Sequence, residues 1–158
     1  MKALRVLIRK VARGDIERII DIERSWQHLS HWSIDSYYRL ISEDSFTSSY
    51  VAEVEADNGS SRVVGFVIFH IIAEVSEIYN IAVESGYARA GIGTHLMRAA
   101  IDESSRRMAV KVVLEVRKYN NPAINFYIGF DFKIVGERRN YYSNPIEDAY
   151  VMEYEISR

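Results

Sequence analysis

Apolar residues recur along the chain with two different periods, and each period predicts one kind of element. Seven segments alternate apolar and polar positions, or run apolar with β-branched and aromatic residues, as strands do. The predicted strands span residues 4–12, 48–56, 62–73, 74–83, 109–117, 130–139 and 148–156. The segment of residues 109–117 is almost continuously apolar, which favours a strand in the centre of a sheet.

Four further segments carry apolar residues at helical spacing. The predicted helices span residues 14–26, residues 31–42, a stretch that follows a loop within residues 85–100 and runs to about Arg107, and residues 121–127. Asp15 is placed to cap the first helix, and Ser33 or Asp35 lies near the start of the second. The order β-α-α-β-β-β-α-β-α-β-β predicts an α/β (α+β) fold with helices packed on a mixed sheet.

Length and composition narrow the class of protein. The chain has 158 residues without repeats or a linker-like stretch, so we expect a single domain over residues 1–158. A net charge of −2 argues against a nucleic-acid partner, and the absence of cysteine excludes thiolate nucleophiles and disulfides. No segment approaches the roughly 20 apolar residues of a membrane span, so we expect a cytoplasmic protein without membrane contact. The histidines lack the spacing of metal ligands, so we expect no metal; they are His28, His31, His70 and His95.

Two glycines stand where the apolar run ending at residue 83 gives way to a helical segment. The first turn of a helix has unpaired N–H groups, and glycine lets the backbone approach a ligand closely. A phosphate or pyrophosphate can be held there by the successive amides of Arg89, Ala90, Gly91, Ile92, Gly93 and Thr94. The Lys-Ser/Thr pair of a P-loop is missing, and Leu96 replaces the third glycine of a dinucleotide fold. Close packing of the helix against a strand is the alternative reason for the glycines.

Three stretches together carry a family resemblance: "IAVESGYARAGIGTHLM", "LEVRKYNNPAINFY" and "ERRNYYSNPIEDAYVM". Their arrangement resembles the GNAT superfamily of acetyl-CoA-dependent N-acetyltransferases. Within it, the chain is most similar to protein N-terminal acetyltransferases, namely the ribosomal-protein alanine N-acetyltransferases and the NatA-type catalytic subunits. The resemblance covers most of the chain and is strongest from Glu77 to Met152. It implies a central mixed sheet of about seven strands with four helices packed on it.

The resemblance also implies how acetyl-CoA is bound. The amides of residues 89–94 would hold the coenzyme A pyrophosphate, and Asn120 would contact the pantetheine, although asparagine at a helix entrance is equally suited to capping. Backbone groups of the preceding strand would pair with the pantetheine arm, at Ile81, Ala82 and Val83. Ala88 stands where the family has Gln or Arg, so a side-chain contact to phosphate depends on Arg89.

The second family motif is Asn-x-x-Ala/Ser-x-x-x-Tyr-x-x-x-Gly-Phe. Asn120, Ala123, Tyr127 and Phe132 match it, and Asp131 stands at the glycine position. That glycine ends a helix in the left-handed conformation, which aspartate is among the few residues to tolerate. We therefore expect Asp131 to have a positive φ.

Three residues are candidates for the chemistry. Glu115 lies in the most apolar strand and matches the general base of the ribosomal-protein alanine acetyltransferases; a structural pairing with Arg117 or a tyrosine is the alternative. Glu77 can hold the water or assist, or it is an exposed residue at a strand end. Tyr127 matches the family tyrosine whose hydroxyl approaches the coenzyme sulfur, which makes it the candidate general acid; otherwise it is a core residue.

The resemblance places the acceptor peptide between two loops. Tyr141 and Tyr142 match a loop that holds the first residues of the substrate backbone, or they are half-buried loop tyrosines. Leu29 is the candidate apolar wall on the other side. Relatives often have Phe-Pro where this chain has Ser30 and His31, so their preference for a first residue does not carry over.

The sequence therefore predicts transfer of acetyl from acetyl-CoA to the N-terminal α-amine of proteins, by direct attack in a ternary complex. Two alternatives stay open. One is a GNAT enzyme that acetylates lysine or a small amine, and the other is a coenzyme A-binding sensor without catalysis. An auxiliary or ribosome-anchoring subunit is a further possible partner.

Overall fold

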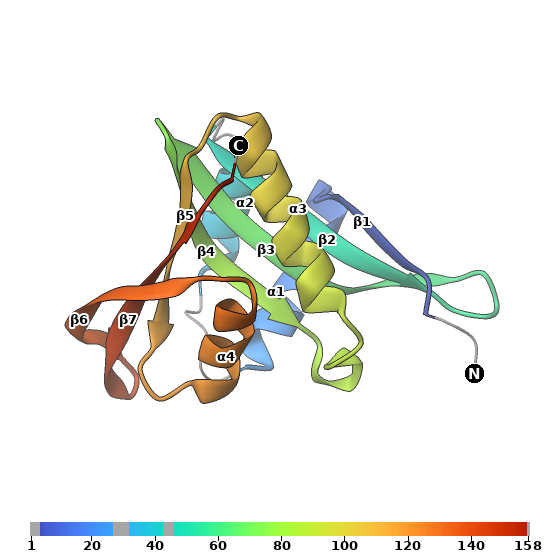
Figure 1. Ribbon diagram of the computed structural model, residues 1–158. Coiled ribbons are helices and arrows are strands. Elements are labelled where there is room, and N and C mark those ends of the chain that lie inside the picture. Colours follow the sequence, from blue (N-terminus) through green and yellow to red (C-terminus); the bar gives the residue numbers. More distant parts are fainter. Residues whose placement is uncertain (1–3, 27–31, 43–45, 158) are drawn as a thin grey trace.

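The computed structural model describes residues 4–26, 32–42 and 46–157, and these form seven strands and four α-helices. The strands join in one sheet of order β1-β2-β3-β4-β5-β7-β6 (Figure 1), with the parallel pair β4–β5 among antiparallel neighbours. The strands are β1 (Val6–Lys10), β2 (Thr47–Glu55), β3 (Ser61–Ile72), β4 (Val75–Val83), β5 (Lys111–Arg117), β6 (Lys133–Ser143) and β7 (Ile146–Glu155). The helices are α1 (Ile16–Arg24), α2 (Ile34–Ser42), α3 (Ile92–Arg106) and α4 (Asn121–Gly129). The predicted fold class and element order are confirmed.

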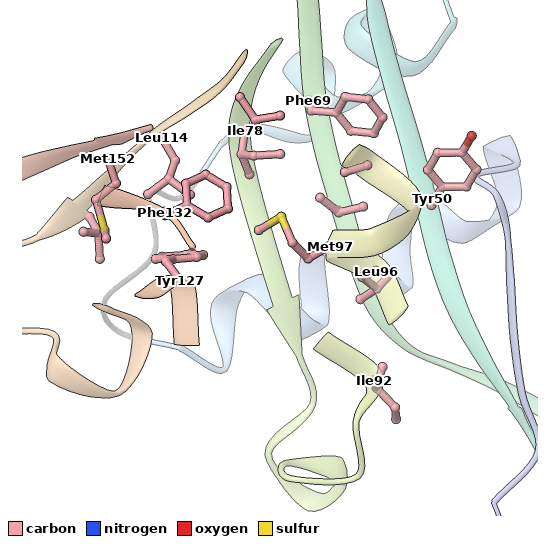
Figure 2. Close-up of a cluster of buried hydrophobic side chains, with 14 of the residues drawn as sticks. Tyr50, Phe69, Ile78, Ile92, Leu96, Met97, Leu114, Tyr127, Phe132 and Met152 are labelled. Atoms are coloured by element: carbon pink, nitrogen blue, oxygen red, sulfur yellow. The ribbon is translucent and has the colours of Figure 1, made fainter. Parts of the chain in front are cut away.

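The helices cover both faces of the sheet, and the alternation of β3 shows how. Val67 and Phe69 belong to the core under α3 and α4, whereas Phe66 and Ile68 belong to the core under α1 and α2. Figure 2 shows the first of these cores, with side chains of α3, α4 and the sheet converging. Successive residues of a strand point to opposite faces, so a strand buried on both sides is apolar at nearly every position. The unbroken apolar character of β3 follows from this burial.

The parallel pairing of β4 with β5 is short. It consists of Val75–Lys111, Ser76–Val112 and Glu77–Val113. Beyond Glu77 the two strands diverge (Figure 1), while β5 stays paired with β7 along its full length. The divergence opens the sheet between Ile78–Val83 and Leu114–Arg117.

The two predicted helix starts have different outcomes. Asp15 occupies the N-cap position of α1, but its side chain makes no capping hydrogen bond to this helix. Its carboxylate accepts instead from the Ala12 N–H (2.7 Å) and from Arg9 (2.7 Å). The nearby guanidinium and the backbone donor lower the pKa of Asp15 against the opposing effect of burial. At α2, Ser33 is the capping residue, because its Oγ accepts from the Ser36 N–H (3.1 Å).

The end of α4 agrees with the prediction for Asp131. Its φ is 71°, and its N–H donates to the Ile128 carbonyl (2.9 Å). Phe132 then turns back into the core and is only 2% exposed. No helix in the described part of the chain is long and apolar enough to cross a membrane.

Candidate active site

The divergence of β4 and β5 leaves a cleft with a volume of about 640 Å³. Its walls are the parted halves of the two strands, the start of α4, Trp26 after α1, and residues of the β6–β7 hairpin. The predicted site residues that line it are Ile81, Ala82, Val83, Gly93, Glu115, Asn120, Tyr127 and Tyr142. Residues predicted from distant parts of the sequence therefore meet in one cavity.

Other predicted residues lie beside the cleft or elsewhere. Glu77 and Tyr141 lie close enough to Glu115 for its charge to act on their ionisation. Thr94 lines a separate hollow between α3 and α4. Leu29 falls outside the described residues.

The loop before α3 has the geometry of an anion cradle. Gly91 is the N-cap of α3 with a φ of 79°, a conformation that strains residues with a side chain. The first hydrogen bond of the helix runs from the His95 N–H to the Gly91 carbonyl (3.1 Å). The amides of residues 92–94 precede this bond, so they are the unpaired donors of the first turn.

Gly93 keeps the cleft open at the foot of α3. A Cβ at this position would lie 3.4 Å from Cζ of Phe126 and 3.9 Å from Cγ2 of Val83, which is ordinary van der Waals contact. The helix and its neighbours approach here, but close packing by itself does not require a glycine at this position. The absence of a side chain leaves room for a ligand.

The open edge of β4 faces the cleft. The Glu84 N–H donates to Val64 of β3 (2.7 Å), and backbone groups alternate along a strand. Those of Ile81 and Val83 therefore point the other way, into the opening. The Val83 carbonyl already accepts from Nε1 of Trp26 (2.8 Å), which fixes the indole against the strand.

Two carboxylates share the α1/α2 face of the sheet at the point of divergence. The Glu115 side chain is 12% exposed, and its Oε1 lies 3.3 Å from Nε of Arg138. The suggested pairing with Arg117 is wrong, because that guanidinium contacts the β6–β7 hairpin instead. Since Arg138 is 53% exposed, Glu115 keeps a cleft-facing carboxylate with one partner at the surface.

Glu77 lies next to Glu115, and its ionisation is opposed. Burial raises the pKa of Glu77 first, and the neighbouring Glu115 raises it further, against the smaller effects of His70 and Arg138. Two carboxylates this close disfavour a second negative charge. Burial and the neighbouring Glu115 therefore both act against the ionised form of Glu77.

Tyr127 lies across the cleft on α4. It is 9% exposed and packs against Phe126 and Phe132. Burial raises its pKa to about 12, so the phenol keeps its proton throughout the neutral range. A buried neutral phenol lining the cleft is suited to donating a hydrogen bond.

Asn120 caps α4, with its Oδ1 accepting from the Ala123 N–H (3.3 Å). It also lines the cleft, so the capping role is compatible with a ligand contact.

The tyrosine pair lies in a strand, which corrects the expected loop. Tyr141 and Tyr142 belong to β6, next to an irregularity in its pairing with β7. Their rings are perpendicular at 5.0 Å, and the Arg117 guanidinium lies 4.2 Å from the Tyr142 ring centre. Burial raises the pKa of Tyr142, whereas Tyr141 is 50% exposed.

The cleft residues that were not predicted from the sequence include Trp26, Asn80, Arg117 and Glu147. Arg117 alone had a signal, as a charge that ends the most apolar strand. It is 6% exposed and donates to the carbonyls of Asn144 and Pro145 (both 3.1 Å) and to Glu147 (3.4 Å).

Comparison with known proteins identifies this architecture. The model of the acetyltransferase (GNAT) family matches residues 15–132, which is most of the chain. The chain belongs to the GNAT family of acetyltransferases. Members of this family use acetyl-CoA, and the unpaired amides at α3, the open edge of β4 and the space above Gly93 fit such a ligand.

Three GNAT relatives illustrate the similarity. The [ribosomal protein bS18]-alanine N-acetyltransferase of Salmonella typhimurium is 31% identical over 144 residues, 87% of this chain and 93% of the relative. An N-alpha-acetyltransferase of Sulfurisphaera tokodaii is 32% identical over 160 residues, 92% of this chain and 90% of the relative. The crystal structure of the ribosomal-protein-S18-alanine N-acetyltransferase from Escherichia coli has a TM-score of 0.82 at 27% identity, covering 98% and 96% of the two chains.

Within residues 4–26, 32–42 and 46–157, no three His, Asp or Glu side chains form a group that could hold a metal ion.

Proposed function

We propose that this enzyme transfers the acetyl group of acetyl-CoA to the N-terminal α-amine of a protein, by direct attack in a ternary complex. One observation carries the proposal: Glu115 and the buried phenol of Tyr127 line the same cleft, on walls formed by β5 and α4. An acceptor for the amine proton and a donor for the leaving sulfur can then act on one thioester between them. The names of the relatives, which are N-acetyltransferases of a ribosomal protein or of α-amines, support an N-terminal substrate.

The coenzyme would enter from the α3/α4 side. The amides of residues 89–94 would hold its pyrophosphate, and the open edge of β4 at residues 81–83 would pair with the pantetheine. Asn120 would flank the pantetheine while it caps α4. This arrangement directs the thioester toward Glu115 and Tyr127.

The chemistry asks little of the base. An α-amine has a pKa of about 7.7–8.0, so roughly a tenth of it is neutral near pH 7. The neutral nitrogen attacks the thioester carbonyl, the C–S bond breaks, and one amine proton leaves for Glu115 directly or through water held with Glu77. The sulfur leaves beside Tyr127, whose phenol donates to it, and coenzyme A departs as the thiol.

The acceptor peptide would approach from the α1/α2 side. Tyr141 and Tyr142 of β6 would flank its first residues, with Leu29 as the apolar wall opposite. The Tyr142 ring lines the cleft, and Tyr141 is exposed enough to be covered by a peptide.

The test is an acetylation assay with purified protein, acetyl-CoA and two peptides of one sequence, followed by mass spectrometry. One peptide has a free α-amine and no lysine, and the other has a blocked N-terminus and one internal lysine. We expect only the first to gain an acetyl group. Acetylation of the second alone would move the function to lysine.

The same assay addresses the remaining alternatives. If neither peptide reacts while acetyl-CoA binds, a small amine or a sensor role takes precedence. Activity of the isolated chain on the first peptide would show that catalysis needs no auxiliary or ribosome-anchoring subunit.

A further inference from the structure

Asn80 of β4 is a buried polar residue with an unused donor. It is 5% exposed and lines the cleft, and its Nδ2 has no hydrogen-bond partner in the part of the chain that the structure describes. A buried amide without a partner destabilises a fold, so native proteins rarely leave one without a reason. At the wall of a substrate cleft, the reason is a partner that arrives with the substrate.

A bulge in β4 determines which side of the sheet Asn80 faces. Ile78 pairs with Phe69 and Asn80 pairs with Ile68, so Tyr79 is an extra residue between them. Directly opposed residues point to the same face, and Ile68 packs under α1 and α2, whereas Phe69 packs under α3 and α4. Without the bulge, Asn80 would share the α3/α4 face with Ile78.

The bulge brings Asn80 to the face that carries the carboxylates. Glu77 is level with Val113 in the parallel pair, so Glu115, two residues further on, points to the same face as Glu77. Asn80 and Glu115 therefore lie on the two diverging walls of the cleft, both toward α1 and α2. The proposed coenzyme contacts at residues 89–94 and 120 lie at the starts of α3 and α4.

We propose that Nδ2 of Asn80 donates a hydrogen bond to the backbone carbonyl oxygen of the acceptor's first residue. This inference rests on the proposed N-terminal function. In any N-terminal residue the α-amine and this carbonyl are separated by a single Cα, with nitrogen and oxygen about 3 Å apart. With the amine at Glu115, the carbonyl lies toward the opposite wall, where Asn80 is.

The contact would select a class of amine. A lysine side chain or an alkylamine has no carbonyl next to its nitrogen, so it leaves the buried amide unpaired. A site that has to pair a polar group discriminates against ligands that lack the partner. Asn80 would thus distinguish α-amines of peptides from other primary amines.

The experiment combines one enzyme variant with one change in the substrate. Asn80→Leu and the wild type are assayed with a lysine-free peptide and with the same peptide carrying a trans-alkene in place of its first amide. We expect Asn80→Leu to lower kcat/KM for the normal peptide about tenfold, as loss of one buried hydrogen bond does. It should leave kcat/KM for the alkene peptide within about twofold of the wild-type value, since that peptide has no carbonyl for Asn80 to bind. The ratio of variant to wild-type kcat/KM is compared between the two peptides, so the difference in basicity between their amines cancels.

Stability provides a second readout that a structural role would not reproduce. Replacing an unpaired buried amide by leucine should leave Tm unchanged or raise it, while activity falls. The matched control is Ser76→Ala on the same strand, because Ser76 is fully buried and has a partner in Ser104 (2.8 Å). This control should lower Tm, and it should leave the ratio of kcat/KM for the normal peptide to kcat/KM for the alkene peptide unchanged.

The outcomes separate this inference from the function on which it rests. Suppose that the wild type acetylates the α-amine peptide, and that Asn80→Leu lowers kcat/KM equally for the normal and the alkene peptide or leaves both values unchanged. The selective contact is then refuted and the N-terminal function stands. If the wild type acetylates only the lysine peptide of the preceding test, both are refuted.

Discussion

At the scale of single residues, the cleft shows how burial assigns different roles to similar groups. Glu115 and Glu77 are both glutamates on one face of the sheet, yet burial and mutual repulsion raise the pKa of Glu77. Tyr127 keeps its proton because burial disfavours the phenolate and raises the pKa of the phenol to about 12. A protonated donor is therefore present in the cleft at neutral pH.

The first prediction concerns Glu115. We expect Glu115→Gln to lower kcat/KM on an α-amine peptide about a hundredfold, the lower end of the range for general bases, since part of the amine is already neutral. Steady-state kinetics at pH 7 would check this. The matched control is Arg138→Gln, which removes the ion pair but keeps the carboxylate, and it should retain activity within about threefold. Equal losses in the two variants would contradict a role as base.

The second prediction concerns the stability of Glu77→Gln. A folded pKa above the unfolded value means that ionisation opposes folding, so the wild type loses stability as pH rises above about 4.5 through the folded pKa. Glutamine does not ionise, and the variant should be more stable than the wild type at pH 7 but not at pH 4. Urea unfolding at both pH values measures this. The control is Glu74→Gln at an exposed position, which should differ little from the wild type in free energy of unfolding at either pH. If the stability difference between Glu77→Gln and the wild type is the same at pH 4 and pH 7, the proposed cost of ionising Glu77 is contradicted.

At the scale of elements, the turn of the β6–β7 hairpin is held by a side chain of β5. Arg117 of β5 donates to Asn144, Pro145 and Glu147, and stacks on Tyr142. The Glu147 carboxylate also accepts from the Tyr119 N–H (2.9 Å), which ties the loop before α4 to the same hairpin. The orientation of the tyrosine pair at the cleft therefore depends on Arg117.

The third prediction is that Arg117→Met weakens use of the peptide more than use of acetyl-CoA. Removing one partner of a largely buried pair should cost about 3 kcal/mol of stability. In the folded variant, KM for the peptide should rise several-fold, while the Kd for acetyl-CoA from calorimetry should stay near the wild-type value. The exposed ion pair of Lys118 with Glu137 offers the control, since Lys118→Met should change neither constant. A matching loss of acetyl-CoA affinity would contradict a role confined to the hairpin.

The fourth prediction concerns the junction of the loop with α3. Gly93→Val would place atoms against Phe126 and Val83 and into the cleft, so we expect acetyl-CoA to bind at least about tenfold more weakly. Calorimetric titration with acetyl-CoA measures the change. Gly86→Val in the preceding 3-10 turn is the control, because a Cβ there meets nothing within 4 Å, and it should bind normally. Normal binding by both variants would contradict the proposed coenzyme position.

At the scale of the whole molecule, the site exists because the sheet parts. β5 keeps its pairing with β7 while β4 keeps its pairing with β3, so each half of the sheet is complete on its outer side. Helices on both faces support the halves, with α3 and α4 on one face and α1 and α2 on the other (Figure 1). The opening is accessible from both faces of the sheet, so two substrates that enter from opposite faces can meet within it.

The fifth prediction is the pH profile of the assembled site. With Tyr127 protonated up to about pH 12, the group that limits kcat/KM near neutrality should be the substrate amine. We expect kcat/KM for an α-amine peptide to rise about tenfold per pH unit up to about pH 7.7, and then to level off as the amine becomes neutral. A peptide whose amine has a lower pKa should shift the break by the same amount. A break that does not follow the amine would point to an enzyme group instead.

Local patterns were sufficient for the elements and for part of the site. Periods of two and 3.6 residues depend only on which face of an element is buried, so strands, helices and their order could be predicted from the chain itself. The positive φ of Asp131 and the Gly91 cap follow from the conformational limits of single residues. The tyrosine pair was assigned to a loop because the polar run before it hides the continuation of β6.

Long-range pairing determined the rest. Whether Glu115 pairs with Arg117 or Arg138 depends on the position of β6, which no spacing along β5 encodes. Asn80 faces α1 and α2 because of one extra residue in β4, and a shift of one residue reverses every later side chain of a strand. The cleft itself begins where the parallel pairing of β4 with β5 stops after Glu77. Periodicity is a property of neighbours along the chain, whereas register and partners are properties of segments that meet only in the folded protein.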